Sequence, residues 1–405
     1  MKKLFILAVI LIGAVSAFSQ NATKINESFT AETYLSKDEG MSIEAYFAMN
    51  DNLYAGIGEA RLSDLVSFFK YSISGNTWTK LKDFPGNNQR YGAISFMYNG
   101  KGYFGLGGGD APSNSDIWEY DPANDSWTKF TDFPDGKLSQ AAVFVIDNYA
   151  YIGSGVTSGS GEQSRSDFWK LDMNTKAWSK IASIPQPLER ASGFAVGGKG
   201  YLAGGEYIYS DTYRNQLLEY DPQADTWTVK LTDANLLHFR EGRAAVVGNE
   251  AFLFYGNKNQ VAKYTPADNK LEQLSDFIGL GEERYSALCL AYNGNIYYGL
   301  GYYDDDNGSA QYPRDLWRLT INPTGIQEIN PSENIKAGFD KSTHCVWIHS
   351  DQPVTRVEIV DVAGRKALES QALQSINVSQ LPKGYYLVVV QSGQESHTQK
   401  VFIDN

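Results

Sequence analysis

Five arginines recur at comparable points along the chain, each at or just before a short apolar run. They are Arg90, Arg190, Arg240, Arg243 and Arg284. Glutamates fall in similar places, at Glu59, Glu206, Glu241, Glu282 and Glu283. Guanidinium and carboxylate groups together can hold a carboxylated or hydroxylated sugar through paired hydrogen bonds. The alternative is that each arginine pairs with a glutamate or a carbonyl of a neighbouring repeat and only stabilises the scaffold.

Tyrosines gather in two loops that follow these arginines. They are Tyr207, Tyr209 and Tyr213 in one loop, and Tyr302, Tyr303 and Tyr312 in the other. A tyrosine offers an apolar ring face and a hydroxyl, which suits both sugars and protein partners. The rings could equally pack their own loops against the scaffold.

Other chemistry finds little support in the sequence. The acidic run Asp304 to Asn307 is contiguous, and no glutamate closes it at the spacing that a calcium loop requires. Only His238 lies among the repeats, too few histidines for a zinc or copper site. Gly105 to Asp110 is rich in glycine but lacks the lysine of a phosphate-binding loop. We therefore expect no metal and no cofactor.

The elements that must position these residues are repeated strands. The stretch from Arg90 to Pro134 reads as four short strands separated by turn residues, and versions of it recur along most of the chain. One column holds Trp78, Trp127, Trp178 and Trp227. A second column, at the end of the third strand, holds Tyr71, Tyr120, Leu171, Tyr220, Tyr264 and Leu319. A third places an aromatic residue four positions before a glycine, as in Tyr103 and Gly107.

This pattern resembles the kelch repeat, and it predicts an all-β fold. Six units of roughly 50 residues with four strands each imply a six-bladed β-propeller over residues 25–325. One blade cannot bury both faces alone, so the tyrosines, tryptophans and glycines are expected to be scaffold. The sixth unit lacks its fourth strand. We expect the segment from Phe29 to Tyr34 to supply it, with Gly325 to Ile329 as the alternative.

The two ends of the chain differ from the repeats. Residues 1–19 combine two lysines, an apolar run and small residues, the pattern of a secretory signal peptide. Residues 330–405 read as a small immunoglobulin-like β-sandwich. They resemble the C-terminal sorting domain (Por secretion tail) of the type IX secretion system, although Ile335 to Gly338 replaces the usual opening segment. The matching residues are Asp361, Gly364, Arg365, Leu381, Gly384, Tyr385 and the strand around 401–403.

Composition limits the partners. The formal net charge of −12 and the lack of a basic stripe argue against nucleic acid. No segment after the signal peptide is apolar and long enough to cross a membrane. Cys289 and Cys345 are expected to be unbonded apolar thiols, although the sequence does not exclude a disulfide. We expect a protein of a Gram-negative bacterium that passes through the periplasm and is secreted or held at the cell surface.

These features predict a non-catalytic binding module. Long loops on one face of a rigid repeat scaffold would present a binding site to a glycan or a surface protein, and residues 330–405 would contact the secretion machinery. The expected ligand-binding residues are Arg90, Arg190, Glu206, Tyr207, Arg214, Arg240, Arg243, Arg284 and Tyr302. The alternative is a sugar mutarotase or epimerase similar to the kelch sialic acid epimerases. Glu206 would then be the acid/base, with Arg190, Arg214 and Arg240 holding a carboxylate.

Overall fold

The protein is almost entirely β-structure, in two compact units spanning Met1–Ile321 and Asn322–Asn405. The computed structural model describes residues 22–26, 41–60, 63–86, 90–108, 114–157, 163–207, 215–239, 241–256, 260–274, 284–305, 307–321, 335–350, 354–361, 366–370, 375–392 and 395–404. Within these residues the one helix is a 3-10 turn, η1 (Ala234–His238), and no helix is long and apolar enough to cross a membrane.

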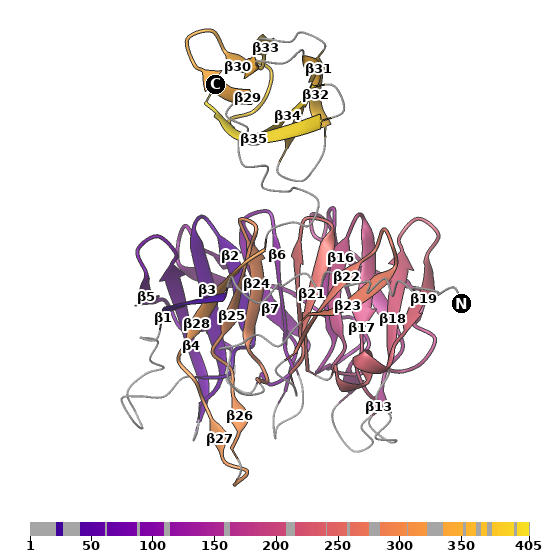
Figure 1. Cartoon of the computed structure of the whole chain (residues 1–405). Helices are drawn as coiled ribbons and strands as arrows, with labels where there is room; N and C mark the ends of the chain where they lie inside the picture. The colour runs from indigo at the N-terminus through magenta and orange to yellow at the C-terminus, as the bar shows by residue number, and fades with distance from the viewer. Residues whose placement is uncertain are drawn as a thin grey trace, which may run out of the picture. The chain divides into compact units, whose positions relative to one another are not determined.

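Six four-stranded antiparallel sheets form the first unit (Figure 1). Sheet 1 is β2 (Ala45–Met49), β3 (Asn52–Ala60), β4 (Ser63–Ser72) and β5 (Thr77–Lys80). Sheet 2 is β6 (Ile94–Tyr98), β7 (Lys101–Gly105), β8 (Asp116–Asp121) and β9 (Ser126–Asp132). Sheet 3 is β10 (Ala142–Ile146), β11 (Tyr149–Gly153), β14 (Phe168–Asp172) and β15 (Trp178–Ile181).

The other three sheets repeat this order. Sheet 4 is β16 (Ser192–Val196), β17 (Lys199–Ala203), β18 (Gln216–Asp221) and β19 (Thr226–Thr232). Sheet 5 is β20 (Arg243–Val247), β21 (Glu250–Phe254), β22 (Val261–Thr265) and β23 (Lys270–Leu274). Sheet 6 is β24 (Leu288–Tyr292), β25 (Asn295–Gly299), β28 (Leu316–Thr320) and β1 (Ala22–Asn26). Chain order and spatial order agree everywhere except at β1.

The first strand of each sheet contacts the first strands of both neighbouring sheets. These contacts run from β2 through β6, β10, β16, β20 and β24 and return to β2. Backbone hydrogen bonds join the sheets just before these strands. The amide of Gln140 donates to Gly92 (2.7 Å), that of Arg190 to Gln140 (3.1 Å), and that of Ile43 to Ser286 (2.7 Å). The last bond links sheet 6 to sheet 1.

The aromatic columns of the sequence form the core between sheets, as predicted. Tyr120 and Tyr220 are buried, and each lies opposite the tryptophan of its own sheet. Rings also meet across sheets: the centroids of Phe68 and Trp127 are 5.1 Å apart, and those of Phe168 and Trp227 are 4.9 Å apart. Such edge and tilted ring contacts add to the free energy of apolar burial.

The recurring glycine after the second strand is required by both space and backbone geometry. Gly107 has a φ of +75°, and a Cβ there would lie 2.7 Å from the carbonyl oxygen of Arg90. Gly155, Gly205 and Gly301 have φ values of +81°, +92° and +80°, and a Cβ there would meet a carbonyl oxygen of the segment just before the first strand of the same sheet. A side chain would clash in a backbone conformation that only glycine adopts freely.

The outermost strand of sheet 6 comes from the N-terminal side of the chain, as predicted, but from an earlier segment. β1 (Ala22–Asn26) pairs antiparallel with β28, with Ala22 opposite Leu319. The expected segments, Phe29–Tyr34 and Gly325–Ile329, lie outside the described residues. The six-sheet unit therefore starts before residue 25, because its closing strand begins at Ala22.

The second unit contains two antiparallel sheets around one apolar core. One sheet is β29 (Ile335–Asp340), β30 (Cys345–Ser350) and β33 (Ser375–Asn377). The other is β32 (Lys366–Ser370), β31 (Val354–Asp361), β34 (Gly384–Ser392) and β35 (Glu395–Ile403). Val346, Ile359 and Val388 are among the buried residues that both sheets contribute to the core. Cys345 and the buried Cys289 are both free thiols, as expected.

Candidate functional site

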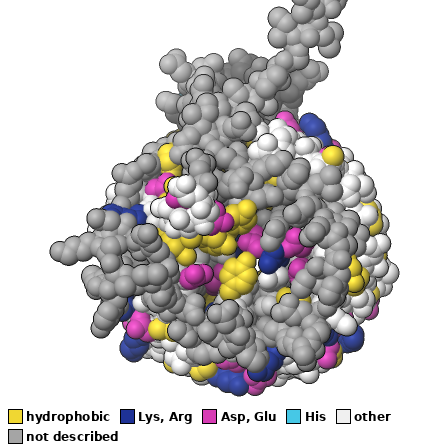
Figure 2. All heavy atoms as spheres, turned by 90° about the horizontal axis from the view of Figure 1, so that it is seen from below, with side chains coloured by type: hydrophobic (Ala, Val, Ile, Leu, Met, Phe, Trp, Pro, Cys, Tyr) yellow, Lys and Arg dark blue, Asp and Glu magenta, His cyan; other side chains and the backbone are white. Residues whose placement is uncertain are grey.

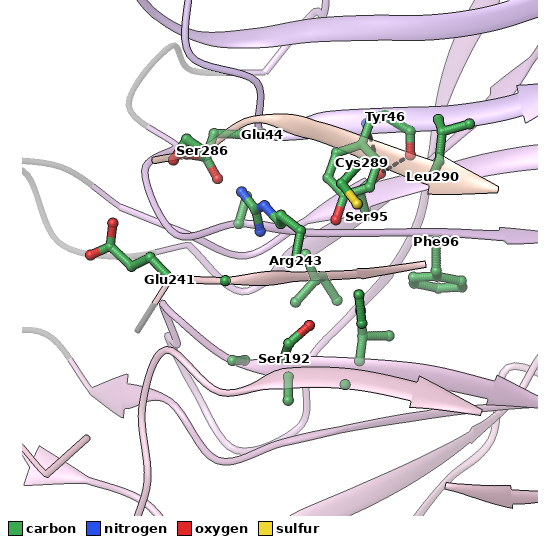
Figure 3. A pocket seen from close by; sticks show the side chains of 18 of the residues that line it. Glu44, Tyr46, Ser95, Phe96, Ser192, Glu241, Arg243, Ser286, Cys289 and Leu290 are labelled. Carbon is green, nitrogen blue, oxygen red and sulfur yellow. Dashed lines mark hydrogen bonds between the residues drawn. The ribbon is translucent and has the colours of Figure 1, made fainter. Parts of the chain in front are cut away.

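A cavity of about 430 Å³ lies among the first strands of the six sheets. Its lining runs from charged residues before these strands, such as Arg190 and Glu241, to apolar residues inside, such as Phe96 and Leu290 (Figure 3). This volume falls within the range of small-molecule binding pockets. We call the charged end the mouth, and the part lined by the strands the inner channel.

The mouth is built from residues in a strained backbone conformation. Five equivalent residues, each two positions before its first strand, have positive φ values. They are Gly92 (64°), Gln140 (55°), Arg190 (58°), Glu241 (52°) and Ser286 (43°). The left-handed conformation costs a residue other than glycine about 1–2 kcal/mol. Strain of this kind persists only where surrounding contacts enforce it, and it often marks functional sites.

Arg190 is the centre of the polar contacts at the mouth. Its Nη1 lies 2.5 Å from Oε1 of Glu206, and its Nε lies 3.1 Å from Oε1 of Glu241. The hydroxyl of Tyr91, from sheet 2, donates to the same oxygen of Glu241 at 2.9 Å. Burial alone would lower the pKa of Arg190, but Glu241, Tyr91 and Glu206 outweigh it and raise that pKa. Three sheets thus meet in one charged network.

The tyrosine side of the mouth comes from sheet 6. Tyr302 and Tyr285 form an isolated antiparallel β-bridge through their backbones, and their ring centroids are 5.4 Å apart. Burial, followed by the charge of Glu241, raises the pKa of the Tyr302 hydroxyl, so this group stays protonated. Tyr207 directly follows Glu206 and is partly exposed. Figure 2 shows apolar, acidic and basic side chains together at the middle of this face.

Glu44 and Arg243 form a second polar group, in the inner channel. Figure 3 shows the guanidinium of Arg243 pointing toward Glu44 and Ser286. Glu44 is buried and accepts a hydrogen bond from the Ser286 hydroxyl at 2.9 Å. Burial raises the pKa of Glu44 to about 7, while the charge of Arg243 and the Ser286 hydrogen bond hold it back. This carboxyl can gain or lose a proton near neutral pH.

Two predicted ligand-binding arginines lie elsewhere. Arg90 forms a bidentate pair with Asp116, with Nη1 to Oδ1 at 2.6 Å and Nη2 to Oδ2 at 2.9 Å. Arg284 pairs with Asp315 at the same distances. Both arginines are buried within their own sheets and do not line the cavity. This geometry fits the scaffold alternative, because their donors already satisfy carboxylates.

The remaining predicted site residues divide into three groups. The structure brings Arg190, Glu206, Arg243 and Tyr302 to the mouth or the inner channel. Tyr207 directly follows Glu206 in the chain and is not among the residues that line the cavity. Arg214 and Arg240 lie outside the described residues.

Sequence reasoning missed Glu44 and Tyr91. The repeat carries a signal for the first of them: the residue one position before the first strand is Ala93, Ala141, Ala191, Gly242 or Ala287 in the other sheets. A glutamate in a column of small residues marks a departure from the scaffold. Tyr91 has no such signal, because Tyr285 occupies the same position in sheet 6.

The acidic loop forms a turn. It joins the short strands β26 (Tyr303–Asp304) and β27 (Ala310–Gln311). Oδ1 of Asp305 accepts hydrogen bonds from the amides of Asn307 and Ser309, both at 2.9 Å. Among the residues with described positions, no group of three or more histidine, cysteine and acidic side chains could hold a metal ion.

Comparisons with known proteins bear on the two units separately. No curated protein matches the chain. A solved structure titled "Structure of YjhT" is similar with a TM-score of 0.58 and 18% identity, over 71% of this chain and 96% of that one. This likeness concerns the fold. Residues 342–404 match the family described as the secretion system C-terminal sorting domain, and a tail of this type IX kind implies export.

Proposed function

We propose that the chain is an exported six-bladed kelch-type β-propeller that binds a glycan at the mouth of its channel. The observation that carries this proposal is the network of Arg190, Glu206, Glu241 and Tyr91, which three sheets direct to one end of a cavity of about 430 Å³. Alternating carboxylate, guanidinium and hydroxyl groups match the donors and acceptors of a sugar ring. Tyr302 adds an aromatic ring at the same place.

A glycan suits this site better than a surface protein does. Protein partners bind through broad surfaces with a buried apolar centre, whereas ligand pockets are concave with a few placed polar groups. The polar groups here meet at the entrance of a cavity. Binding of a surface protein with no glycan binding would contradict the assignment.

The binding experiment uses the mature full-length chain on a glycan array. We expect Arg190→Gln to abolish binding of the selected glycan, since it removes the charge that orders both glutamates. Arg356→Gln is a matched control, because Arg356 lies in the second unit and pairs with Glu358 and Glu369. Equal binding by wild type and Arg190→Gln, with both proteins folded, would rule out the mouth as the site.

Export gives the proposal a cellular location. The C-terminal unit would deliver the protein through the periplasm to the type IX machinery of a Gram-negative bacterium, and the ligand would be met outside the cell. Deleting residues 330–405 should leave the protein in the periplasm, as measured by fractionation. Unchanged arrival at the surface would disprove a sorting role.

A sugar mutarotase or epimerase is the second candidate. The position of Glu206 favours an enzyme. This nearly buried carboxylate lies at the mouth, and Arg190 forms ion pairs with both Glu206 and Glu241. In that reaction Glu206 would move a proton at the anomeric oxygen or ring carbon of the sugar. Proton exchange spectroscopy of N-acetylneuraminate anomers tests it. Faster exchange that Glu206→Gln abolishes would establish an enzyme, whereas no acceleration together with glycan binding would leave a binding module.

A further inference from the structure

Glu44 and Arg243 of the inner channel differ in type from the residues at the same repeat positions in the other sheets. Their two repeat positions are adjacent. The first residue of the first strand is Arg243 in sheet 5, whereas it is Ala45, Ile94, Ala142, Ser192 or Leu288 in the other five sheets. Glu44 likewise stands in a column of alanine and glycine. Burying either charge has an unfavourable desolvation free energy that the small residues of the other sheets avoid. Scaffold needs therefore do not explain this pair.

The guanidinium of Arg243 lacks a strong acceptor. Its Nε is buried without a hydrogen-bond partner, and its Nη2 lies 3.5 Å from the carbonyl oxygen of Ile43. A further neighbour with a hydrogen-bonding group is the hydroxyl of Tyr46, which is neutral. The guanidinium carbon, Cζ, lies 5.4 Å from the ring centroid of Tyr46. Among the described residues, no carboxylate forms an ion pair with it, although Tyr46, Glu44 and Glu241, in that order, raise its pKa against the effect of burial. A buried donor of this kind implies an acceptor that binds from the channel.

Beyond Arg243 the cavity becomes apolar. Figure 3 shows Phe96 and Leu290 on the side away from Glu241, with Arg243 between the two ends. The polar side chains of the inner lining include Tyr46, Ser95 and Ser192, and the Ser95 hydroxyl already donates to the carbonyl oxygen of Tyr46. Six more residues of the inner lining are small or apolar: Met97, Ala141, Val143, Ala245, Val246 and Ala291. These side chains offer a sugar few hydrogen-bond partners, whereas an alkyl or aryl group would displace water from them.

We propose that the inner channel binds a small amphipathic carboxylate, with its carboxylate on Arg243 and its apolar part against Phe96 and Leu290. The two oxygens of the ligand would accept from the guanidinium in the paired geometry that arginine favours. The space extends from a charged to an apolar end, which matches an acid with a short chain or a single ring. This site is separate from the glycan site at the mouth and does not depend on it.

Glu44 makes this binding depend on pH. Its surroundings are Arg243 from β20, Glu241 before that strand, Tyr46 of β2, and Cys289 and Ser286 from sheet 6. Tyr91 and Tyr302 lie close enough to feel its charge and stay neutral. An ionised Glu44 competes with the carboxylate of the ligand for Arg243 and also repels that carboxylate. A protonated Glu44 does neither. Affinity should therefore rise as pH falls from 8 to 6, by up to about tenfold per pH unit above the pKa.

Isothermal titration calorimetry of the mature full-length chain with hexanoate tests the proposal, and hexanamide serves as the neutral ligand of equal shape. We expect hexanoate to bind at least tenfold more tightly than hexanamide, and more tightly at pH 6 than at pH 8. Arg243→Gln should remove this preference, and Glu44→Gln should remove the pH dependence while keeping the binding. Equal affinity for the two ligands, or an unchanged preference in Arg243→Gln, would overturn the proposal.

Two further variants keep the test decisive. Arg243→Lys retains the positive charge, so it should fold if Arg243→Gln does not, and it should bind hexanoate more weakly because the paired geometry is lost. Arg190→Gln alters only the mouth, so hexanoate binding should persist in it even where glycan binding fails. Loss of hexanoate binding in Arg190→Gln, but not in Arg243→Lys, would assign the ligand to the mouth and refute the inner site.

Discussion

Arg90 and Arg284 differ from Arg190 and Arg243 in almost every contact, although all four lie within four residues of the start of a first strand. Arg90 and Arg284 each donate to an aspartate at the beginning of the third strand, Asp116 in β8 and Asp315 directly before β28, with equal distances. Each aspartate also accepts a hydrogen bond from the indole N–H of the tryptophan two residues later, at 2.6 Å from Trp118 and 2.7 Å from Trp317. Arg190 and Arg243 have no such repeated partner and face the cavity.

This contrast separates scaffold from site. A contact that recurs in several sheets solves a problem that every sheet shares, which is to satisfy buried polar groups next to an apolar interface. Sheet 3 has a variant of it, in which Arg165 pairs with Asp167 and Trp169 donates to the same carboxylate at 3.1 Å. A charged residue that occurs in one sheet alone has no such shared purpose. Its desolvation must be offset by a function or by a contact specific to that place.

The largest effect should come from breaking a scaffold pair. Arg90→Met leaves Asp116 largely buried without its cation, so we expect the free energy of unfolding to fall by about 3 kcal/mol. Urea unfolding followed by tryptophan fluorescence measures this. The double variant Arg90→Met/Asp116→Leu should recover most of the loss, because it removes both buried charges.

An exposed ion pair of the same sheet is the control for that prediction. Lys101 lies 2.5 Å from Glu119, but 39% of its side chain is exposed. Lys101→Met should change the free energy of unfolding by less than about 1 kcal/mol. If both variants lost the same stability, burial would not distinguish the scaffold pairs and the contrast would fail.

A second effect, of about the same size, should appear in the channel as a dependence of stability on pH. The pKa of Glu44 is about 7 in the folded protein and near 4.5 when exposed, so the folded state binds more protons between these values. Stability from this group is full below pH 4.5 and falls as pH rises through 7, by roughly 3 kcal/mol in total. Glu44→Gln removes this loss. The stability difference between the variant and wild type should therefore grow in favour of the variant from pH 5 to pH 8 in urea titrations.

Because the other ionisable groups are the same in both proteins, their titration cancels in that difference. A constant difference across this pH range would mean that Glu44 is ionised throughout, contrary to its buried position. Such a result would also remove the proposed pH dependence of carboxylate binding.

The sequence predicts the repeated features well and the unique ones poorly, for a physical reason. The tyrosine, tryptophan and glycine columns recur because each sheet must pack against its neighbours, so one sequence contains several copies of the evidence. Arg90 and Arg284 share this regularity, and their paired contacts with Asp116 and Asp315 fit the scaffold alternative better than a ligand-binding role. Glu44 occurs once, and its proximity to Arg243 depends on sheets 1 and 5 meeting around the channel. The sequence predicts that an N-terminal segment completes sheet 6, and β1 is such a segment. Which residues of that segment pair with β28 depends on contacts with residues such as Leu319, far away in the sequence, which a local pattern does not encode.

The smallest effect should come from a single hydroxyl at the mouth. The Tyr91 hydroxyl donates to the carboxylate of Glu241, a contact between sheets 2 and 5. Tyr91→Phe should reduce the free energy of unfolding by about 1–2 kcal/mol, because hydrogen bonds to charged groups stabilise a protein more than neutral ones do.

Tyr98→Phe is the matched control: Tyr98 is also in sheet 2, and its hydroxyl contacts the neutral amide groups of Asn148 and Asn174 at an exposed place. We expect less than about 1 kcal/mol for the control in the same urea titrations. A larger loss in Tyr98→Phe would show that the mouth network adds little to stability. Glu241 would then be held chiefly by Arg190, and the site would depend on one cation instead of on contacts from three sheets.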